Sequence, residues 1–338
     1  MKGATNMNNN VRRTMLAAIG IALGAAALGG AAPALAQNAW PNKPITIVVA
    51  YPAGGDTDVL ARLMAEKLAA RLKQSVVVEN RTGAAGTIGS AYVARAAADG
   101  YTLLIAPNTV SIAPLVLKAG TGANYDVQND FTPIAQLGTQ SLFVVVGKTT
   151  GITKMSDLVA RAKAGKLETY ATPGNGSPMH IMGEMFNRSA NVKIAQVPYR
   201  GTAPAIVDVL GGQVPMTYVT YGAVAQYVGN GSLIPLAVAD QKRSPFAPNV
   251  PTLSELGYKD VEIGAWQALM GPKNLAPEIV RTLNGHVNEI LKQPDVVARM
   301  ATIAVTPVGG EPAVLQKLIA SDTSRFTKLV KEFGIQAD

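Results

Sequence analysis

Short apolar segments alternate with amphipathic segments along most of this 338-residue chain. Residues 45–51 read ITIVVAY, a β-branched run typical of a strand that is covered on both faces. Residues 56–72 then place apolar side chains at three- and four-residue spacing, which predicts a helix. A strand at 75–80, a helix at 86–100 and a strand at 101–106 repeat the alternation. This order predicts an α/β fold with a parallel sheet and right-handed crossovers.

A second block of the same build begins after a polar stretch at 124–132. Its predicted strands are 141–147, 167–173, 195–199, 214–221 and 233–239, and its predicted helices are 155–165, 177–189, 202–212 and 222–231. Residues 261–272 are predicted to be a return strand, followed by helices at 277–293, 294–301 and 311–333. We therefore expect two lobes, the first from residues 37–139 and 262–338 and the second from residues 140–261. Ligands of such sheets bind outside the carboxyl ends of the strands, which here means the cleft.

Residues 1–36 have the composition of a secretory signal peptide. Lys2, Arg12 and Arg13 precede an apolar run at 15–28, and Ala-Leu-Ala at 34–36 offers a cleavage site after Ala36. A membrane anchor is the alternative, although the apolar run is short for a bilayer. Loss of this segment lowers the formal net charge from +8 to +5. We expect an exported, periplasmic protein.

The sequence lacks the signatures of several classes of protein. The charge is spread thinly and aromatic residues make up 5% of the chain, so no nucleic-acid-binding surface is indicated. The chain has no cysteine and two histidines, which gives no zinc constellation, and it lacks the G-x-S-x-G and P-loop spacings. Glycines at 83, 86 and 89 miss the dinucleotide-binding spacing. We therefore expect no catalytic residues, metal or cofactor.

Two glycine turns stand where a predicted strand gives way to a predicted helix. The first reads YPAGGDTD (51–58) and the second ATPGNGSPMH (171–180). Helix N-termini carry unpaired N–H groups at the positive end of the helix dipole, and glycine lets a ligand approach them. Two such turns, one in each lobe, suit a clamp around a small anion, and the alternative is a pair of tight turns without a ligand. Asp56 would repel an anion, so it is expected to point outward as a cap.

Three further residues have a structural and a functional interpretation. Ser177 can cap the second helix, and His180 on its first turn is either structural or a ligand contact. Arg200, in VPYRGTAPA, could pair with a carboxylate, whereas a solvated arginine is the alternative.

Five segments, in order, resemble one known family. They read YPAGGDTDVLAR, VVVENRTGAAGTIGSAYVARAAADGYTLL, YATPGNGSPMHIMGEMF, VPYRGTAPAIVDVLGGQVP and KRSPFAPNVPTLSELG. They are similar to the Bug/TctC family, the extracytoplasmic solute receptors of tripartite tricarboxylate transport systems, over essentially the whole mature chain. The resemblance implies a type II-like periplasmic-binding-protein fold, with two crossing strands and a central ligand cleft. It also implies a monomer that takes a small carboxylate and meets the membrane permease subunits of such a transporter.

The resemblance further implies that one carboxylate lies between the PAGG turn and the GNGS turn. The ligand-binding positions that follow from it are Tyr51, Ala53, Gly54, Gly55, Thr57, Asp58, Thr87, Asn108, Ser141, Pro173, Asn175, Gly176, Ser177, His180, Thr202 and Thr220.

Two departures from the family pattern bear on the ligand. Asp56 stands where family members often have a small residue, and Val219 where they commonly have an aspartate. Without that aspartate we expect a less polar ligand, an aromatic mono- or dicarboxylate such as terephthalate. It would pack against tyrosine or valine side chains and bond Thr220 or Tyr221. A sensor for a signalling partner and an enzyme that uses the same cleft are the alternatives.

Overall fold

A computed structural model of the chain describes residues 40–117 and 124–335. The described residues from Lys43 onward form one compact unit, and residues 40–42 belong to a separate N-terminal segment. The predicted signal peptide lies outside the described residues. No helix in the described ranges has the length and apolar character needed to cross a bilayer.

The first sheet forms the first lobe, with strand order β2-β1-β3-β9-β4. Its strands are β1 (Ile45–Val49), β2 (Val76–Asn80), β3 (Thr102–Pro107), β4 (Phe131–Gly147), β9 (Gly264–Pro272) and, paired with β4, the short β10 (Thr306–Pro307). The first three are parallel, as their alternation with helices predicts, and β9 runs antiparallel to both β3 and β4. The carboxyl ends of β1, β2 and β3 therefore lie at one edge of this sheet.

The second sheet forms the second lobe. Its strands are β4, β5 (Thr169–Thr172), β6 (Ala195–Pro198), β7 (Met216–Thr220) and β8 (Leu233–Val238). β5 is parallel to both β6 and β7, and β4 is antiparallel to β7 and β8.

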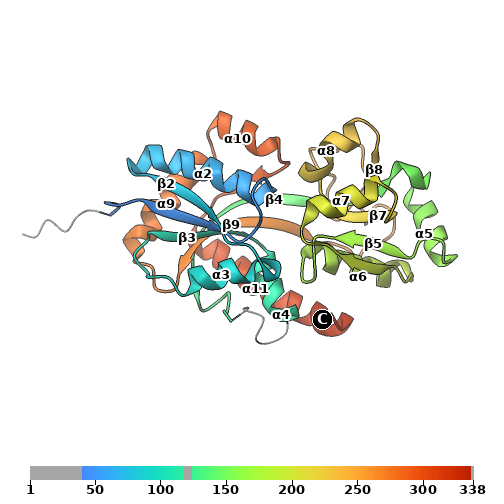
Figure 1. The fold of residues 1–338 in the computed structure, drawn as a ribbon, viewed down its shortest axis with the longest axis horizontal. Helices are drawn as coiled ribbons and strands as arrows, with labels where there is room; N and C mark the ends of the chain where they lie inside the picture. The colour runs from blue at the N-terminus through green and yellow to red at the C-terminus, as the bar shows by residue number, and fades with distance from the viewer. Residues whose placement is uncertain (1–39, 118–123, 336–338) are drawn as a thin grey trace, which may run out of the picture. The chain divides into compact units, whose positions relative to one another are not determined.

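Strand β4 belongs to both sheets and passes from one lobe to the other beside β9 (Figure 1). Residues up to Ser141 pair with β9, and residues from Leu142 onward pair with β7 and β8. The predicted start at residue 141 is wrong, because β4 begins at Phe131. Pro133, Gly138 and interspersed polar residues interrupt the apolar pattern that would predict the first half of this strand. It forms because it pairs with β9. The predicted return strand is confirmed as β9.

Helices cover both sheets. The first lobe has α2 (Asp56–Leu72), α3 (Thr87–Ala94), α4 (Thr109–Val116), α9 (Pro277–Ile290), α10 (Pro294–Ala301), α11 (Pro312–Phe333) and the 3-10 turn η1 (Ala84–Gly86). The second has α5 (Met155–Lys163), α6 (Pro178–Ala190), α7 (Thr202–Leu210), α8 (Tyr221–Gly229) and the 3-10 turn η2 (Lys148–Thr150). Helices α6, α9, α10 and α11 begin with proline at a first-turn position, where its missing N–H costs no hydrogen bond. The helix predicted at 86–100 is shorter, ending at Ala94.

One hydrophobic cluster joins the lobes. Ile112 and Val116 of α4 and Phe326 of α11 pack with buried residues of the second lobe that include Met182 and Phe186. Arg188 of α6 also forms an ion pair with Glu332 of α11. The two lobes thus meet through apolar contacts as well as through the crossing strands.

Candidate functional site

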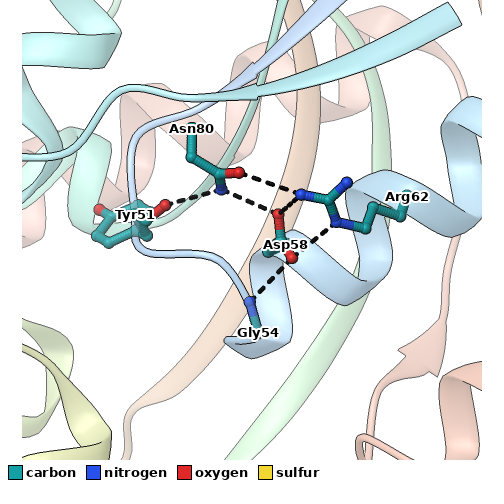
Figure 2. Close-up of polar contacts among 5 residues, drawn as sticks. All are labelled: Tyr51, Gly54, Asp58, Arg62 and Asn80. Carbon is teal, nitrogen blue, oxygen red and sulfur yellow. Dashed lines mark hydrogen bonds and ion pairs between the residues drawn. The ribbon is translucent and has the colours of Figure 1, made fainter.

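The turn between β1 and α2 is held by the carboxylate of Asp58 (Figure 2). Its Oδ2 accepts hydrogen bonds from the N–H of Gly54 and from Nε of Arg62, each at 2.9 Å. Its Oδ1 accepts from Nη2 of Arg62 at 3.0 Å and from Nδ2 of Asn80 at 2.9 Å. Asn80 also donates to the carbonyl of Tyr51 at 3.0 Å, which ties the ends of β1 and β2 together. The turn is therefore fixed in shape before any ligand arrives.

Asp58 is 3% exposed, and burial on its own would raise its pKa. The hydrogen bonds from Arg62, Gly54 and Asn80 outweigh that effect and hold the pKa of Asp58 below its ordinary value. Both carboxylate oxygens of Asp58 are engaged within the turn, so this side chain shapes the turn.

The tip of this turn is open to solvent. Ala53, Gly54 and Gly55 are exposed, and Gly54 has a φ of 85°, a conformation that other residues rarely adopt. Helix α2 starts at its N-cap Gly55 without a side-chain cap. The N–H of Gly54 is used by Asp58, so the donors that remain for an anion are those of the first turn of α2.

The neighbouring loops of the first lobe hold three of the predicted site residues. The hydroxyls of Tyr51 and Thr87 donate to backbone carbonyls of η1 at 3.3 and 2.8 Å, and burial raises the pKa of Tyr51. Asn108 is fully buried and donates from Nδ2 to the carbonyl of Gly264 at 3.0 Å. Its Oδ1 has no hydrogen-bond partner among the described residues. Asn108 therefore keeps a free acceptor, while Tyr51 and Thr87 shape the loop.

The second-lobe turn is capped as the sequence predicts. Oγ of Ser177 accepts from the N–H of His180 at 3.2 Å and donates to the carbonyl of Gly174 at 2.8 Å. Gly174 and Gly176 have φ values of 139° and 72°, so both turn glycines are used for their conformational freedom. His180 is buried, which lowers its pKa to about 4, and its Nδ1 is without a hydrogen-bond partner in the described part of the chain.

The two lobes approach each other at this turn. A methyl group built on Gly176 would lie 3.2 Å from the Cα of Ala113 in α4. Three buried polar atoms at the starts of these two helices have no partner within the described ranges: Asn108 Oδ1 and Ser111 Oγ at α4, and His180 Nδ1 in the first turn of α6. Such groups are rare in protein interiors and often mark a ligand or water site.

Asp56 points into the molecule, and the expectation that it points outward is wrong. Its Oδ2 accepts hydrogen bonds from Gln140 of β4 at 2.8 Å and from Thr220 of β7 at 2.9 Å. Gln140 in turn accepts from Gln267 of β9 at 3.2 Å, and Gln267 accepts from Thr57 at 3.2 Å. This chain of bonds joins α2 of the first lobe, both crossing strands and the end of β7 in the second lobe.

The apolar residues invoked for an aromatic ligand lie elsewhere. Tyr218 is fully buried against Tyr170, with ring centroids 5.0 Å apart. Val219 is 1% exposed and packs with Phe143 on the opposite face of the sheet. Tyr221 is half-buried against Phe143, with centroids 5.2 Å apart. Thr220 of this segment bonds to a group of the first lobe, namely Asp56.

The remaining predicted residues divide between the second lobe and a separate cavity. Pro173, Asn175 and Thr202 are half-buried at the starts of α6 and α7. Ser141 lies in a cavity of about 600 Å³ together with Asp240, and this cavity is otherwise lined by residues outside the predicted set. Arg200 is exposed. No group of three or more histidine, aspartate or glutamate side chains in the part of the chain described is placed to hold a metal ion.

The residues that sequence reasoning missed are the polar side chains behind the turns: Arg62, Asn80, Ser111, Gln140 and Gln267. Arg62 follows Asp58 by four residues, a spacing at which opposite charges pair on a helix. Gln267 is a polar residue in an otherwise apolar segment, AWQALM, which is the signal that could have found it, whereas Gln140 stands among other polar residues and gives no such signal. In the structure the two side chains are 3% and 4% exposed.

Two α/β lobes, joined by antiparallel crossing strands and with helix N-termini at their junction, define a two-lobed solute-binding protein. The family described as the tripartite tricarboxylate transporter family receptor (TctC) matches residues 60–335. The chain belongs to this family.

Similar proteins agree with that assignment. Protein BugT of Bordetella pertussis is 37% identical over 321 residues, which cover 95% of this chain and 97% of BugT. The structure "R. palustris Rpa4515 with adipate" is 32% identical, with a TM-score of 0.82 over 88% of this chain and 99% of that one. "MatC (Rpa3494) from Rhodopseudomonas palustris with bound malate" is 29% identical, with a TM-score of 0.79 over 86% of this chain and 100% of that one. The two complexes hold adipate and malate, which are both carboxylates.

Proposed function

We propose that this protein is a periplasmic receptor that captures a small carboxylate and presents it to the permease subunits of a tripartite tricarboxylate transporter. The observation that carries the proposal is that one helix N-terminal turn from each lobe contacts the other lobe. Gly176 lies against α4, and Asp56 of α2 bonds to Thr220 of β7. Relatives that hold adipate and malate support a carboxylate as the ligand.

The carboxylate would be held by helix N-termini from both sides. In the first lobe, the uncapped start of α2 at Gly55 and Thr57 supplies backbone donors beside the exposed Ala53. In the second lobe, Asn175 and Gly176 precede α6. Because Ser177 already donates its hydroxyl proton to Gly174, its part is to fix the turn.

The narrower ligand class that the sequence predicts is an aromatic mono- or dicarboxylate such as terephthalate. With Tyr218 and Val219 packed in the core, a flat ring would have to rest on other surfaces of the cleft. We therefore propose the carboxylate class as the function and include aromatic acids as one arm of the test.

Export and the choice of partner complete the proposal. Residues 1–36 would act as a signal peptide cleaved after Ala36, and the mature monomer would bind its ligand without a cofactor. The alternative is a sensor that passes its liganded form to a signalling partner. Measurement of ligand uptake distinguishes the sensor from a transport receptor. Deletion of the gene abolishes ligand uptake for a transport receptor and leaves it intact for a sensor.

Thermal-shift screening of a carboxylate library tests the proposal. A ligand that binds only the folded protein raises its melting temperature, by an amount set by concentration and affinity. The library holds adipate, malate, citrate, terephthalate, benzoate and amino acids, with the matching amides and alcohols as controls, and calorimetry confirms each hit. We expect binding confined to carboxylates with no turnover of the bound compound. Stabilisation by the uncharged controls alone would overturn the proposal.

A further inference from the structure

Asp56 brings a carboxylate to the point where the two lobes meet. It stands directly after the exposed turn of Ala53 to Gly55 and is itself part-exposed. Its two hydrogen bonds, from Gln140 at 2.8 Å and Thr220 at 2.9 Å, end on the same oxygen, Oδ2. The second oxygen, Oδ1, has no hydrogen bond from another residue of the described ranges.

No cation of the described residues balances this carboxylate. Its two partners are a neutral amide and a neutral hydroxyl. The nearest basic side chain in sequence, Arg62, is paired with Asp58 at 2.9 Å. Burial also keeps His180 neutral above about pH 4, since it lowers the pKa of that imidazole.

A clamp for an anion that contains its own unpaired carboxylate is electrostatically incomplete. A ligand with only negative groups would place like charges near each other in a partly desolvated cleft, which is unfavourable. A ligand that carries a positive group beside its carboxylate removes this conflict, because the cation pairs with Asp56 while the carboxylate meets the helix N-termini.

We propose that Asp56 selects the ligand, and that the cleft takes a carboxylate that also carries an ammonium group. This inference rests on the proposed function and names the ligand class within it. The ammonium donates to Oδ1 of Asp56, and Thr220 and Gln140 hold Oδ2 so that the carboxylate faces the ligand.

Matched pairs of small acids test the assignment by calorimetric titration. Each pair is a dicarboxylate and the amino acid in which an ammonium replaces one carboxylate: succinate with 3-aminopropanoate, and adipate with 5-aminopentanoate. Terephthalate with 4-(aminomethyl)benzoate adds an aromatic pair, in which a protonated aminomethyl group replaces one carboxylate. We expect the amino member of at least one pair to bind roughly tenfold or more tightly than its dicarboxylate, as for a charge-assisted hydrogen bond.

The variant Asp56→Asn keeps the shape of the side chain and removes its charge. We expect it to lose the preference for the ammonium member, with weaker binding of that member and unchanged or tighter binding of the dicarboxylate. Asp322→Asn is the control, because Asp322 is also a part-buried carboxylate bonded by a neutral donor, Trp266 at 2.6 Å, outside the clamp. Melting temperatures verify that both variants fold. If Asp56→Asn does not fold, the titrations of the matched ligand pairs into the wild-type protein decide whether the inference holds.

Dicarboxylates that bind wild type as tightly as their amino partners would overturn this inference and leave the receptor function standing. The same holds if Asp56→Asn retains the wild-type preference, since Asp56 would then act as a neutral acid. Failure of every carboxylate to bind would overturn the proposed function, and this inference with it.

Discussion

Asp56 and Asp58 are separated by one residue, yet their environments move their pKa values in opposite directions. Burial raises the pKa of Asp56 against the hydrogen bonds from Gln140 and Thr220, which are neutral. For Asp58, bonds that include a charged guanidinium outweigh burial and lower the pKa. The sequence does not reveal this difference, because the partners of the two residues at positions 80, 140 and 220 come together only in the folded chain.

Replacement of Asp58 with alanine should loosen the first-lobe turn. It removes the acceptor for the N–H of Gly54 and the partner of Arg62 and Asn80. We expect a loss of about 2–3 kcal/mol in the free energy of unfolding, typical for a buried polar network that loses its central member. Urea denaturation measures it. Arg62→Gln keeps Asp58 and its bond to the backbone, so it should lose less free energy of unfolding. An equal loss in the two variants would show that the ion pair alone accounts for the stabilisation.

His180 should make the stability of the fold sensitive to mild acid. Burial lowers its folded-state pKa to about 4, from an ordinary value of 6.5. The unfolded state then binds a proton more readily, so stability is full above pH 6.5 and falls as the pH drops from 6.5 toward 4. We expect a loss of about 2 kcal/mol in the free energy of unfolding between pH 7 and pH 5.

His180→Asn should remove most of that loss, whereas His286→Asn should leave most of it in place. Burial and nearby Arg71 also lower the pKa of His286, but that residue is half-buried on α9. Denaturation at the two pH values compares the three proteins. An unchanged pH dependence in His180→Asn would contradict the assignment.

At the scale of elements, local pattern predicts most of the fold. Strands β1, β2 and β3 and helices α2 and α6 lie within a few residues of their predicted positions, because apolar spacing and turn residues agree there. Helix α4 (Thr109–Val116) was not predicted, since its Pro114 and β-branched residues are poor helix formers. It forms against α11, and it supplies the surface on which the second-lobe turn rests.

The candidate site also combines local features with contacts between segments that are distant in the sequence. The two glycine turns and the cap Ser177 are local features and could be predicted. The bonds of Asp56 and the burial of Tyr218 and Val219 depend on which strands pair, and β7 pairs with β4 through residues 142–146. Alternation along β7 alone does not say which face is covered, because both faces are buried.

The close approach of Gly176 to α4 predicts the effect of added bulk. In Gly176→Val the added Cβ would lie 3.2 Å from the Cα of Ala113. The φ of 72° at this position is also unfavourable for a β-branched residue. We expect loss of carboxylate binding by tenfold or more, on the order of 1.4 kcal/mol, measured by calorimetry.

Gly165→Val is the matched control. Gly165 has a similar φ of 66° and nothing within 4 Å of an added Cβ, so it shares the backbone strain without the contact. Gly165→Val should show the loss of stability that the strained φ alone causes, and only Gly176→Val should lose affinity. Binding by Gly176→Val as tight as that of wild type would remove this turn from the site.

At the scale of the whole molecule, the lobes touch at contacts that a hinge motion would break. Thr220 bonds to Asp56, Gly176 lies against α4, and Gly222 of α8 lies against the backbone of Ile303. β4 and β9 are the strands that join the lobes, so closure and opening would turn about them. Sequence pattern cannot predict these contacts, because each joins segments that are more than 60 residues apart and belong to different lobes.

Gly222→Ala should therefore shift the molecule toward an open form. A Cβ at this position would lie 2.3 Å from the carbonyl oxygen of Ile303, a distance that backbone atoms cannot accept. Separation of the lobes relieves the clash without unfolding either sheet. We expect the melting temperature without ligand to change little, and the apparent affinity for a carboxylate to fall roughly tenfold, because the binding-competent closed form becomes a minor population.

Small-angle scattering with and without ligand provides the direct measurement. Wild type should contract when its ligand is added, whereas Gly222→Ala should stay expanded until the ligand concentration is raised in proportion to the lost affinity. Gly229→Ala, in the same helix but with nothing within 4 Å of the added Cβ, should behave as wild type. Identical scattering profiles for wild type with and without saturating ligand would show that binding does not close the lobes. In that case the contact at Gly222 would belong to a fixed interface, and its substitution should lower the melting temperature instead.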